Sequence, residues 1–134
     1  MPPLHFLEGV FALAKVLVID SDSYSRAQLR EVLEKAGHEL EEASNGKLCV
    51  AKFEWSPADL VTTGIVMPEM DGLETIKALK GSFPGVKIIL ASGYDQNGDL
   101  GMLALARELG ASNSLSKPVD RQKLLQAVGL LIDS

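Results

Sequence analysis

Four polar side chains follow apolar runs of this chain and have the types needed for phosphate or metal chemistry. Asp20 and Asp22 stand directly after one apolar run, Ser92 after a second and Lys117 after a third. Carboxylates are ligands that Mg²⁺ prefers, and a hydroxyl and an ammonium group can contact phosphate oxygens. A solvated strand end would explain any one of these residues, but the four together indicate a site, either present or ancestral.

Short apolar runs alternate with amphipathic stretches five times along the chain. Continuous apolar runs are typical of strands buried in a parallel sheet. The pattern predicts strands at residues 15–19, 39–43, 60–65, 86–91 and 112–115, and helices at residues 23–36, 47–55, 71–81, 99–109 and 120–132. Five such units with short connections predict an α/β domain with a doubly wound, five-stranded parallel sheet and five helices.

The carboxyl ends of the predicted strands are where a ligand is expected, because doubly wound sheets bind ligands beyond those ends. The residues at these ends are Asp20 to Asp22, Gly64, Ser92 and Lys117. Among the local signals, Ser23 is expected to cap the first helix. Asp71, with Glu74 three residues later, predicts a capping box for the third helix.

Length and composition favour one ordered domain. The chain has 134 residues and 46% of them are apolar, which suits a single hydrophobic core. We expect residues 1–14 to be an N-terminal extension and residues 15–134 to be the domain. The net charge of −5 gives no basic surface for nucleic acid or for an anionic membrane. Cys49 is the only cysteine and is expected in the core, so no intramolecular disulfide can form, and a cytoplasmic location is predicted.

The N-terminal extension is apolar but does not have the pattern of a secretory signal. It lacks an early positive charge and a cleavage site of small residues. The sequence favours a frayed extension or a short helix lying on the domain, and a segment that contacts a partner or a membrane is the alternative. Farther along, His38 follows the helix-ending Gly37 and is expected to be an exposed turn residue.

Several motifs, taken in order, resemble the receiver domains of bacterial response regulators. The resemblance covers nearly everything from residue 15 to residue 132. It is carried by Val-Leu-Val-Ile-Asp at 16–20, Asp-Leu-Val at 59–61, Ile-Val-Met-Pro-Glu-Met-Asp-Gly-Leu at 65–73, Ile-Ile-Leu-Ala-Ser-Gly at 88–93 and Leu-Ser-Lys-Pro at 115–118. The resemblance implies a flavodoxin-like strand order of 2-1-3-4-5 and a cis peptide bond between Lys117 and Pro118.

The resemblance also implies a role for each position of the site. In receiver domains, an acidic pair after the first strand binds Mg²⁺, and an aspartate that ends the third strand accepts a phosphoryl group from a histidine kinase. A Ser or Thr after the fourth strand and a lysine after the fifth then contact that group. Asp20, Ser92 and Lys117 match the first acidic position, the hydroxyl and the lysine.

Three positions depart from the receiver pattern. Ser21 stands at the second acidic position, with Asp22 next to it, Gly64 at the phosphoacceptor position and Ser114 at the position of the aromatic switch residue. Glycine has no nucleophile, so residue 64 cannot form an aspartyl phosphate. Asp20 and Asp22 alone should bind Mg²⁺ weakly or not at all, and no cofactor is expected. We expect Lys117 to pair with Asp20 instead and to close the pocket.

These departures predict a degenerate pseudo-receiver of two-component phosphorelay signalling that works without phosphorylation and is not an enzyme. Such a module would act by binding a protein partner, such as a histidine kinase or another signalling protein. A homodimer through the fourth helix, fifth strand and fifth helix is one form of this contact. Leu100, Met102 and Leu103 are candidates for the docking face.

A phosphatase of the haloacid-dehalogenase type is the alternative interpretation. Asp20-Ser21-Asp22 after an apolar strand fits the Asp-x-Asp opening of those enzymes, in which the first aspartate is the nucleophile and the second a general acid and base. Ser92 and Lys117 could supply the later hydroxyl and lysine. The enzymes also need an acidic motif after the lysine, whereas here only the last predicted helix follows it.

Overall fold

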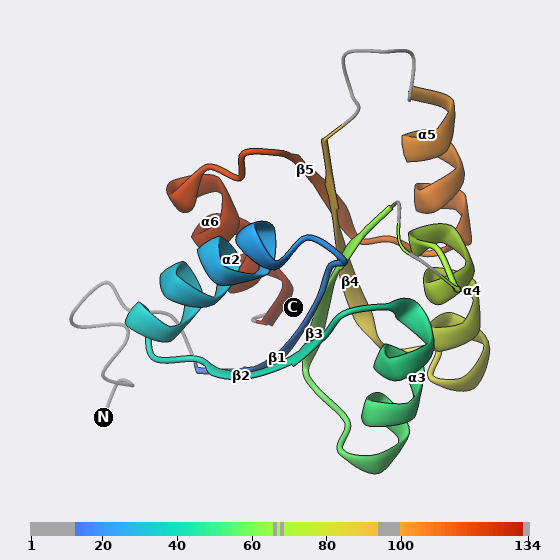
Figure 1. Ribbon diagram of the computed structural model, residues 1–134, viewed down its shortest axis with the longest axis horizontal. Helices are drawn as coiled ribbons and strands as arrows, with labels where there is room; N and C mark the ends of the chain where they lie inside the picture. Colours follow the sequence, from blue (N-terminus) through green and yellow to red (C-terminus); the bar gives the residue numbers. More distant parts are fainter. Residues whose placement is uncertain (1–12, 66, 68, 94–99, 133–134) are drawn as a thin grey trace.

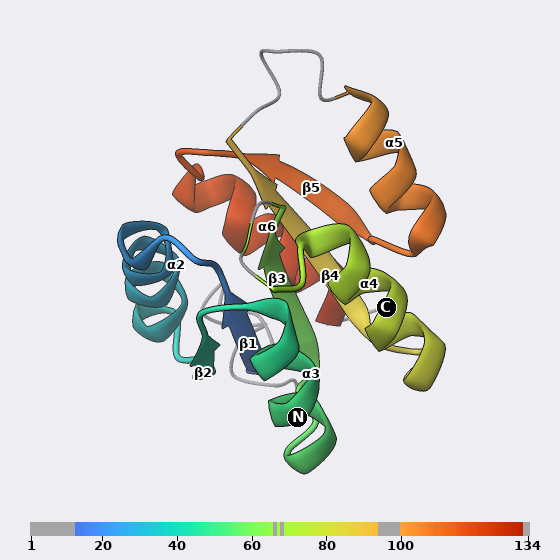
Figure 2. The ribbon, with the colours of Figure 1, turned by 45° about the vertical axis from the view of Figure 1, so that its right-hand side comes forward.

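The protein forms a five-stranded parallel sheet with helices on both faces (Figures 1 and 2). The computed structural model describes residues 13–65, 67, 69–93 and 100–132. The strands are β1 (Lys15–Ile19), β2 (Glu39–Ala43), β3 (Leu60–Gly64), β4 (Lys87–Ser92) and β5 (Asn113–Ser116). Their order in the sheet is β2-β1-β3-β4-β5, which confirms the predicted fold class and strand order.

The helices lie in two layers. They are α2 (Ser23–Lys35), α3 (Gly46–Trp55), α4 (Gly72–Ser82), α5 (Leu100–Leu109) and α6 (Arg121–Ile132). Figures 1 and 2 show α2 and α6 on one face of the sheet and α3, α4 and α5 on the other. The predicted elements are all present, with ends that differ by a residue or two. None of the helices in the described ranges is long and apolar enough to cross a membrane.

The core lies on both faces of the sheet, because side chains alternate along each buried strand. On β1, Leu17 and Ile19 pack toward α3, α4 and α5, whereas Val16 and Val18 pack toward α2 and α6. Cys49 is fully buried on the first of these faces, as expected, and burial raises the pKa of its thiol to about 12. The sheet is therefore packed between two apolar layers, one on each face.

A glycine allows α4 to begin against the end of β3. A Cβ atom on Gly72 would lie 2.1 Å from the carbonyl oxygen of Gly64 and 2.8 Å from Cα of Ile65, so a larger residue cannot fit without a backbone shift. The amide of Gly72 donates to the carbonyl of Ile65 at 2.7 Å. The predicted capping box of Asp71 and Glu74 is present, and it fixes the first turn of α4.

The first strand is anchored by His38, which is buried and not exposed as its turn context predicted. The amide of Ala14 donates to Nδ1 of His38 at 3.1 Å, and the amide of Glu39 donates to the carbonyl of Ala14 at 2.9 Å. Ala14, which precedes β1, is itself buried. Burial of His38 lowers the pKa of its imidazole.

The central strand carries a buried hydroxyl that lacks a partner within the described part of the chain. Thr62 is 1% exposed and its Oγ1 makes no hydrogen bond there. The neighbouring Thr63 is also buried, but its hydroxyl donates to the carbonyl of Gly64 at 3.0 Å. An unpaired buried hydroxyl costs stability because it gives up its hydrogen bonds to water.

We expect Thr62→Val to raise the free energy of unfolding by about 1 kcal/mol, since valine has nearly the same shape and carries no group to desolvate. Urea unfolding monitored by circular dichroism would measure it. Thr63→Val is the matched control on the same strand and should give no such gain, because it removes a hydrogen bond. An equal gain from both substitutions would show that the missing partner of Thr62 is not the cause.

Stability should fall when the pH drops below about 6.5, the ordinary pKa of histidine. The folded protein keeps His38 neutral because its Nδ1 accepts a hydrogen bond and its pKa is lowered, whereas the unfolded chain takes up the proton first. The contribution is therefore present above the unfolded pKa and is lost as the pH falls through the folded one. Denaturant unfolding from pH 8 to pH 5 should show this loss, and His38→Gln should flatten that part of the profile. An unchanged slope in His38→Gln would assign the loss to other groups.

Candidate functional site

The carboxyl ends of β1, β3, β4 and β5 bring most of the predicted site residues together. An open pocket of 340 Å³ lies at this edge of the sheet. Ile65, which follows Gly64, and Ala91 and Gly93, which flank Ser92, contribute to its wall. The full lining is Asp20, Ser21, Asp22, Ile65, Ala91, Gly93 and Lys117.

Asp20 is the buried carboxylate of the site. It follows β1 directly and is 2% exposed. Its Oδ1 accepts from the amide of Asp22 at 3.0 Å, and its Oδ2 accepts from Nζ of Lys117 at 2.5 Å. Its own amide donates to the carbonyl of Ala43 at 3.2 Å. Each carboxylate oxygen therefore has a partner, as a buried charge requires.

Lys117 reaches Asp20 from the loop that follows β5. Its amide donates to the carbonyl of Ser92 at 2.7 Å, which fixes the base of the side chain against the end of β4. The peptide bond between Lys117 and Pro118 is cis, as the resemblance implied. The ion pair with Asp20 is the contact that the sequence predicted for this lysine. The predicted closure of the pocket is wrong, because an open volume of 340 Å³ remains beside the pair. Ser92 ends β4 and is 2% exposed.

Gly64 ends β3 beside this ion pair. A Cβ atom placed on it would lie 3.2 Å from both Cγ and Oδ2 of Asp20 and 3.3 Å from Oδ1. These separations are shorter than an ordinary van der Waals contact, so any side chain at residue 64 would press on the Asp20 carboxylate. A side chain at residue 64 would therefore point toward the Asp20 carboxylate that is paired with Lys117.

Asp22 serves as the cap of α2, and the prediction that Ser23 caps this helix is wrong. The Asp22 carboxylate accepts from the amide of Tyr24 and from the hydroxyl of Ser25, both at 3.0 Å, whereas Ser23 is the first helical residue. The hydrogen bond from Ser25 and that from the Tyr24 amide lower the pKa of Asp22. Ser21, between the two aspartates, is exposed at the pocket wall.

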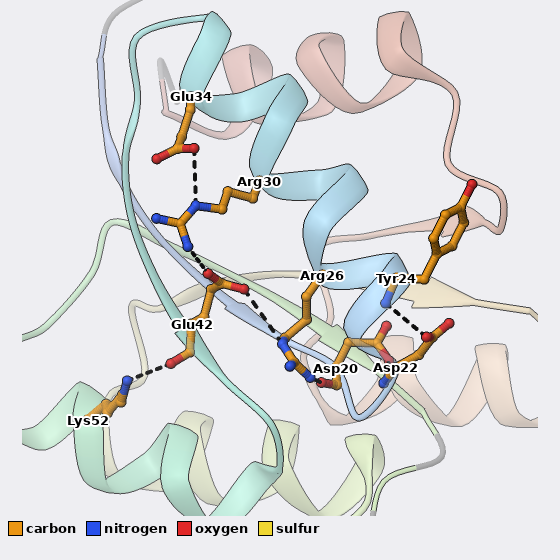
Figure 3. Close-up of polar contacts among 8 residues, drawn as sticks. All are labelled: Asp20, Asp22, Tyr24, Arg26, Arg30, Glu34, Glu42 and Lys52. Carbon is orange, nitrogen blue, oxygen red and sulfur yellow. Dashed lines mark hydrogen bonds and ion pairs between the residues drawn. The ribbon is translucent and has the colours of Figure 1, made fainter.

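A network of charged residues that the sequence did not predict holds the backbone of Asp20 (Figure 3). The Arg26 guanidinium donates to the Asp20 carbonyl at 2.5 Å, and its Nε lies 3.6 Å from Oε1 of Glu42. Glu42 also pairs with Arg30, and its carbonyl accepts from Lys52. The spacing of Arg26 and Arg30, four residues apart on one helix face, is the sequence signal for this contact.

The residues of this site do not fit the Mg²⁺ that receiver domains bind. Mg²⁺ needs several hard oxygen ligands in octahedral geometry. The Asp20 carboxylate is occupied by an ammonium and an amide, and the Asp22 carboxylate caps a helix. Ser21 and Gly64 offer no carboxylate. Within the described residues, no group of three or more Asp, Glu, His or Cys side chains could hold a metal ion.

The other predicted positions have less defined roles. Ser114 lies on the edge strand β5 and is half-buried. Leu103 packs against the core next to α4, so it is a packing residue and a poor docking candidate. The side chains of Leu100 and Met102 lie outside the described residues. On the same helix, Leu105 is exposed, which the sequence analysis did not single out.

The site does not support the alternative of a haloacid-dehalogenase-like phosphatase. The carboxylate of Asp20, which would be the nucleophile, is buried in an ion pair with Lys117. Asp22, which would be the general acid and base, accepts hydrogen bonds as a helix cap and has a lowered pKa. A carboxyl with a lowered pKa is a poor proton donor near neutral pH.

Comparison with known proteins identifies the family of this chain. The sequence pattern of the response regulator receiver domain matches residues 16–129. The chain is 34% identical over 115 residues to the chemotaxis protein CheY of Thermotoga maritima, covering 85% of this chain and 93% of that protein. It is 32% identical over 114 residues to sporulation initiation phosphotransferase F of Bacillus subtilis, covering 85% of this chain and 90% of that protein.

Solved structures of receiver domains have the same fold as this chain. A response regulator receiver domain protein from Clostridium thermocellum superposes with a TM-score of 0.82 at 32% identity, covering 90% of this chain and 94% of the other. A CheY-like receiver domain protein from Methanospirillum hungatei gives 0.83 at 28% identity, covering 91% and 95%. By sequence and by fold, the chain belongs to the response regulator receiver domain family of two-component signalling.

Proposed function

We propose that this receiver domain works without phosphorylation and signals by binding a protein partner in one constitutive state. Gly64 at the end of β3 carries the proposal. Phosphorylation of a receiver needs a nucleophilic oxygen at this position, and glycine supplies none. The direction that such a side chain would take points at the Asp20 carboxylate, which Lys117 neutralises.

The ion pair supports a pocket that is held in one arrangement. The Lys117 ammonium, which would otherwise be available to a phosphoryl group, already has a carboxylate partner at 2.5 Å. The Asp20 side chain is 3% exposed, so water screens this pair less than a surface pair. Separating the two charges would leave the Asp20 carboxylate buried without its counterion, which is strongly unfavourable.

The lack of available metal ligands among the described residues also supports a domain that works without phosphorylation. Transfer to an aspartate needs charge neutralisation on the phosphoryl oxygens, which Mg²⁺ supplies in phosphoryl transfer. Here the carboxylates of Asp20 and Asp22 are engaged by Lys117 and by the first turn of α2. The domain is therefore proposed to need no cofactor and to catalyse no reaction.

The output of such a domain is a fixed surface. Receiver domains interact with signalling proteins such as kinases, and we propose a protein of this kind as the partner, in the cytoplasm. The face made by α5, β5 and α6 is the proposed place of contact, either with that partner or with a second copy. Ser114 on β5 fits this view, because a small side chain cannot act as a rotating aromatic switch between pocket and surface.

The test is incubation with a small acyl phosphate and Mg²⁺, followed by intact-mass measurement. We expect no mass gain for the protein, because residue 64 has no side-chain nucleophile. The double variant Ser21→Asp with Gly64→Asp should gain the mass of one phosphoryl group in an Mg²⁺-dependent manner, since it restores both missing carboxylates beside Asp20.

Ser21→Asp with Gly64→Asn is the matched control, because asparagine has the size of aspartate and no reactive carboxylate. A phosphoryl mass on the unchanged protein would refute the proposal. Failure of the restored double variant to react, with its fold intact by circular dichroism, would show that Asp20, Ser92 and Lys117 no longer form a phosphorylation frame.

A further inference from the structure

An apolar groove lies at the opposite edge of the sheet from the site. It has a volume of 650 Å³. Residues just before β3 and β4, such as Ala58 and Val86, form its floor, so it lies at the amino ends of the strands. Phe53 of α3 and Phe83 after α4 form one wall, with ring centroids 4.7 Å apart. Ile132, at the end of α6, contributes from the other face of the sheet.

The rim of this groove contains Leu13, the first residue that the structure describes. Its side chain is 63% exposed although it is fully apolar. Its Cδ2 atom lies only 3.0 Å from where a Cβ atom on Gly37 would stand. The hydrogen bonds of Ala14 to His38 and Glu39 fix the backbone immediately after it. The chain segment that precedes Leu13 is therefore joined to the fold at the edge of an open apolar groove.

The sequence of that segment is suited to such a surface. Its apolar residues recur at helical spacing, with Leu4, Leu7 and Phe11 in one row and Phe6 and Val10 in the next. The remaining positions of the same turns include His5, Glu8 and Gly9. A helix of this sequence would have one continuous apolar side, and the nine residues 4–12 in a helix would span roughly 14 Å. Such a side is normally covered by protein or lipid.

We propose that residues 4–12 dock their apolar side into the groove lined by Leu13, Phe53, Phe83, Val86 and Ile132, in the same molecule. The covalent link at Leu13 holds the segment at the rim, so docking is intramolecular and has a high effective concentration. The groove lining also includes the polar Asp59, Ser82 and Lys87, and the segment would cover its apolar side chains. This contact removes apolar surface of both from water.

The docked segment would bridge the two helical layers at the amino edge of the sheet. It would touch α3 and α4 through Phe53 and Phe83, and α6 through Ile132. This inference is independent of the proposed function, because the groove is at the opposite strand ends from Gly64 and Lys117. The signalling site would be left open by this contact.

Paramagnetic relaxation enhancement in the 134-residue protein tests the docking. A nitroxide attached to Glu8→Cys marks the polar side of the segment, and the buried Cys49, whose thiol pKa is raised to about 12, should not react with the label. The amide signals of Phe83, Val86 and Lys87 should lose intensity more than that of Gly93 at the far edge. Reducing the nitroxide should restore them.

Substitutions in the segment give the matched comparison. Phe6→Ser with Phe11→Ser, added to the labelled protein, should abolish the selective loss at the groove amides, while His5→Ser should leave it unchanged. A uniform or absent loss in the labelled protein would overturn the proposal. A second sample would mix nitroxide-carrying protein without ¹⁵N with ¹⁵N-enriched protein that carries no nitroxide. A selective loss of amide intensity in this mixture would also overturn the proposal, because it would place the segment on a second copy. A selective loss that appears only with anionic lipid vesicles would also overturn it, by assigning the segment to a membrane.

Discussion

The ion pair between Lys117 and Asp20 is the contact on which the carboxyl edge of the sheet depends. Asp20 has almost no contact with water, so its charge must be met by protein groups. Lys117 meets it from 97 residues away along the chain, and the amide of Asp22 takes the second oxygen. The pair joins the ends of β1 and β5 across β3 and β4. Gly64 lies next to it and leaves room for it, because any side chain there would press on the same carboxylate.

If the domain works without phosphorylation, as proposed, this arrangement explains how the receiver fold persists without that chemistry. The hydrophobic layers on both faces of the sheet provide the stability of the fold, and they do not depend on the residues at the strand ends. The strand ends only need their buried charges satisfied, and the Lys117 ammonium can neutralise the Asp20 carboxylate in place of a metal ion. Under the proposed function, a site whose buried charge is already neutralised gives no chemical trigger for movement. The surface would then present a single state to its partner, which is what a constitutive binding module requires.

The strands and helices could be predicted from the sequence because continuous apolar runs and amphipathic stretches have different periods. The capping box of Asp71 and Glu74 could also be predicted from the sequence, since it depends on two residues three positions apart. Asp22 and Ser23 are both good caps, and only the backbone at the end of β1 decides between them. The burial of His38 was not predicted, because the amide that it accepts from belongs to Ala14, which is distant in sequence. A lone glycine gives no signal of a functional site. Only the receiver-like motif around Gly64 shows that it stands at the phosphoacceptor position.

A double-mutant cycle on the ion pair tests the central claim most directly. Asp20→Asn, Lys117→Met and the double variant would be compared by urea unfolding, with circular dichroism as the probe. If the two side chains stabilise each other as described, their coupling should be about 0.5–3 kcal/mol, the range found for residues in direct contact. The double variant should then be less destabilised than the sum of the single ones. A coupling near zero would contradict the account, because Lys117 could then not be the group that neutralises Asp20 beside Gly64.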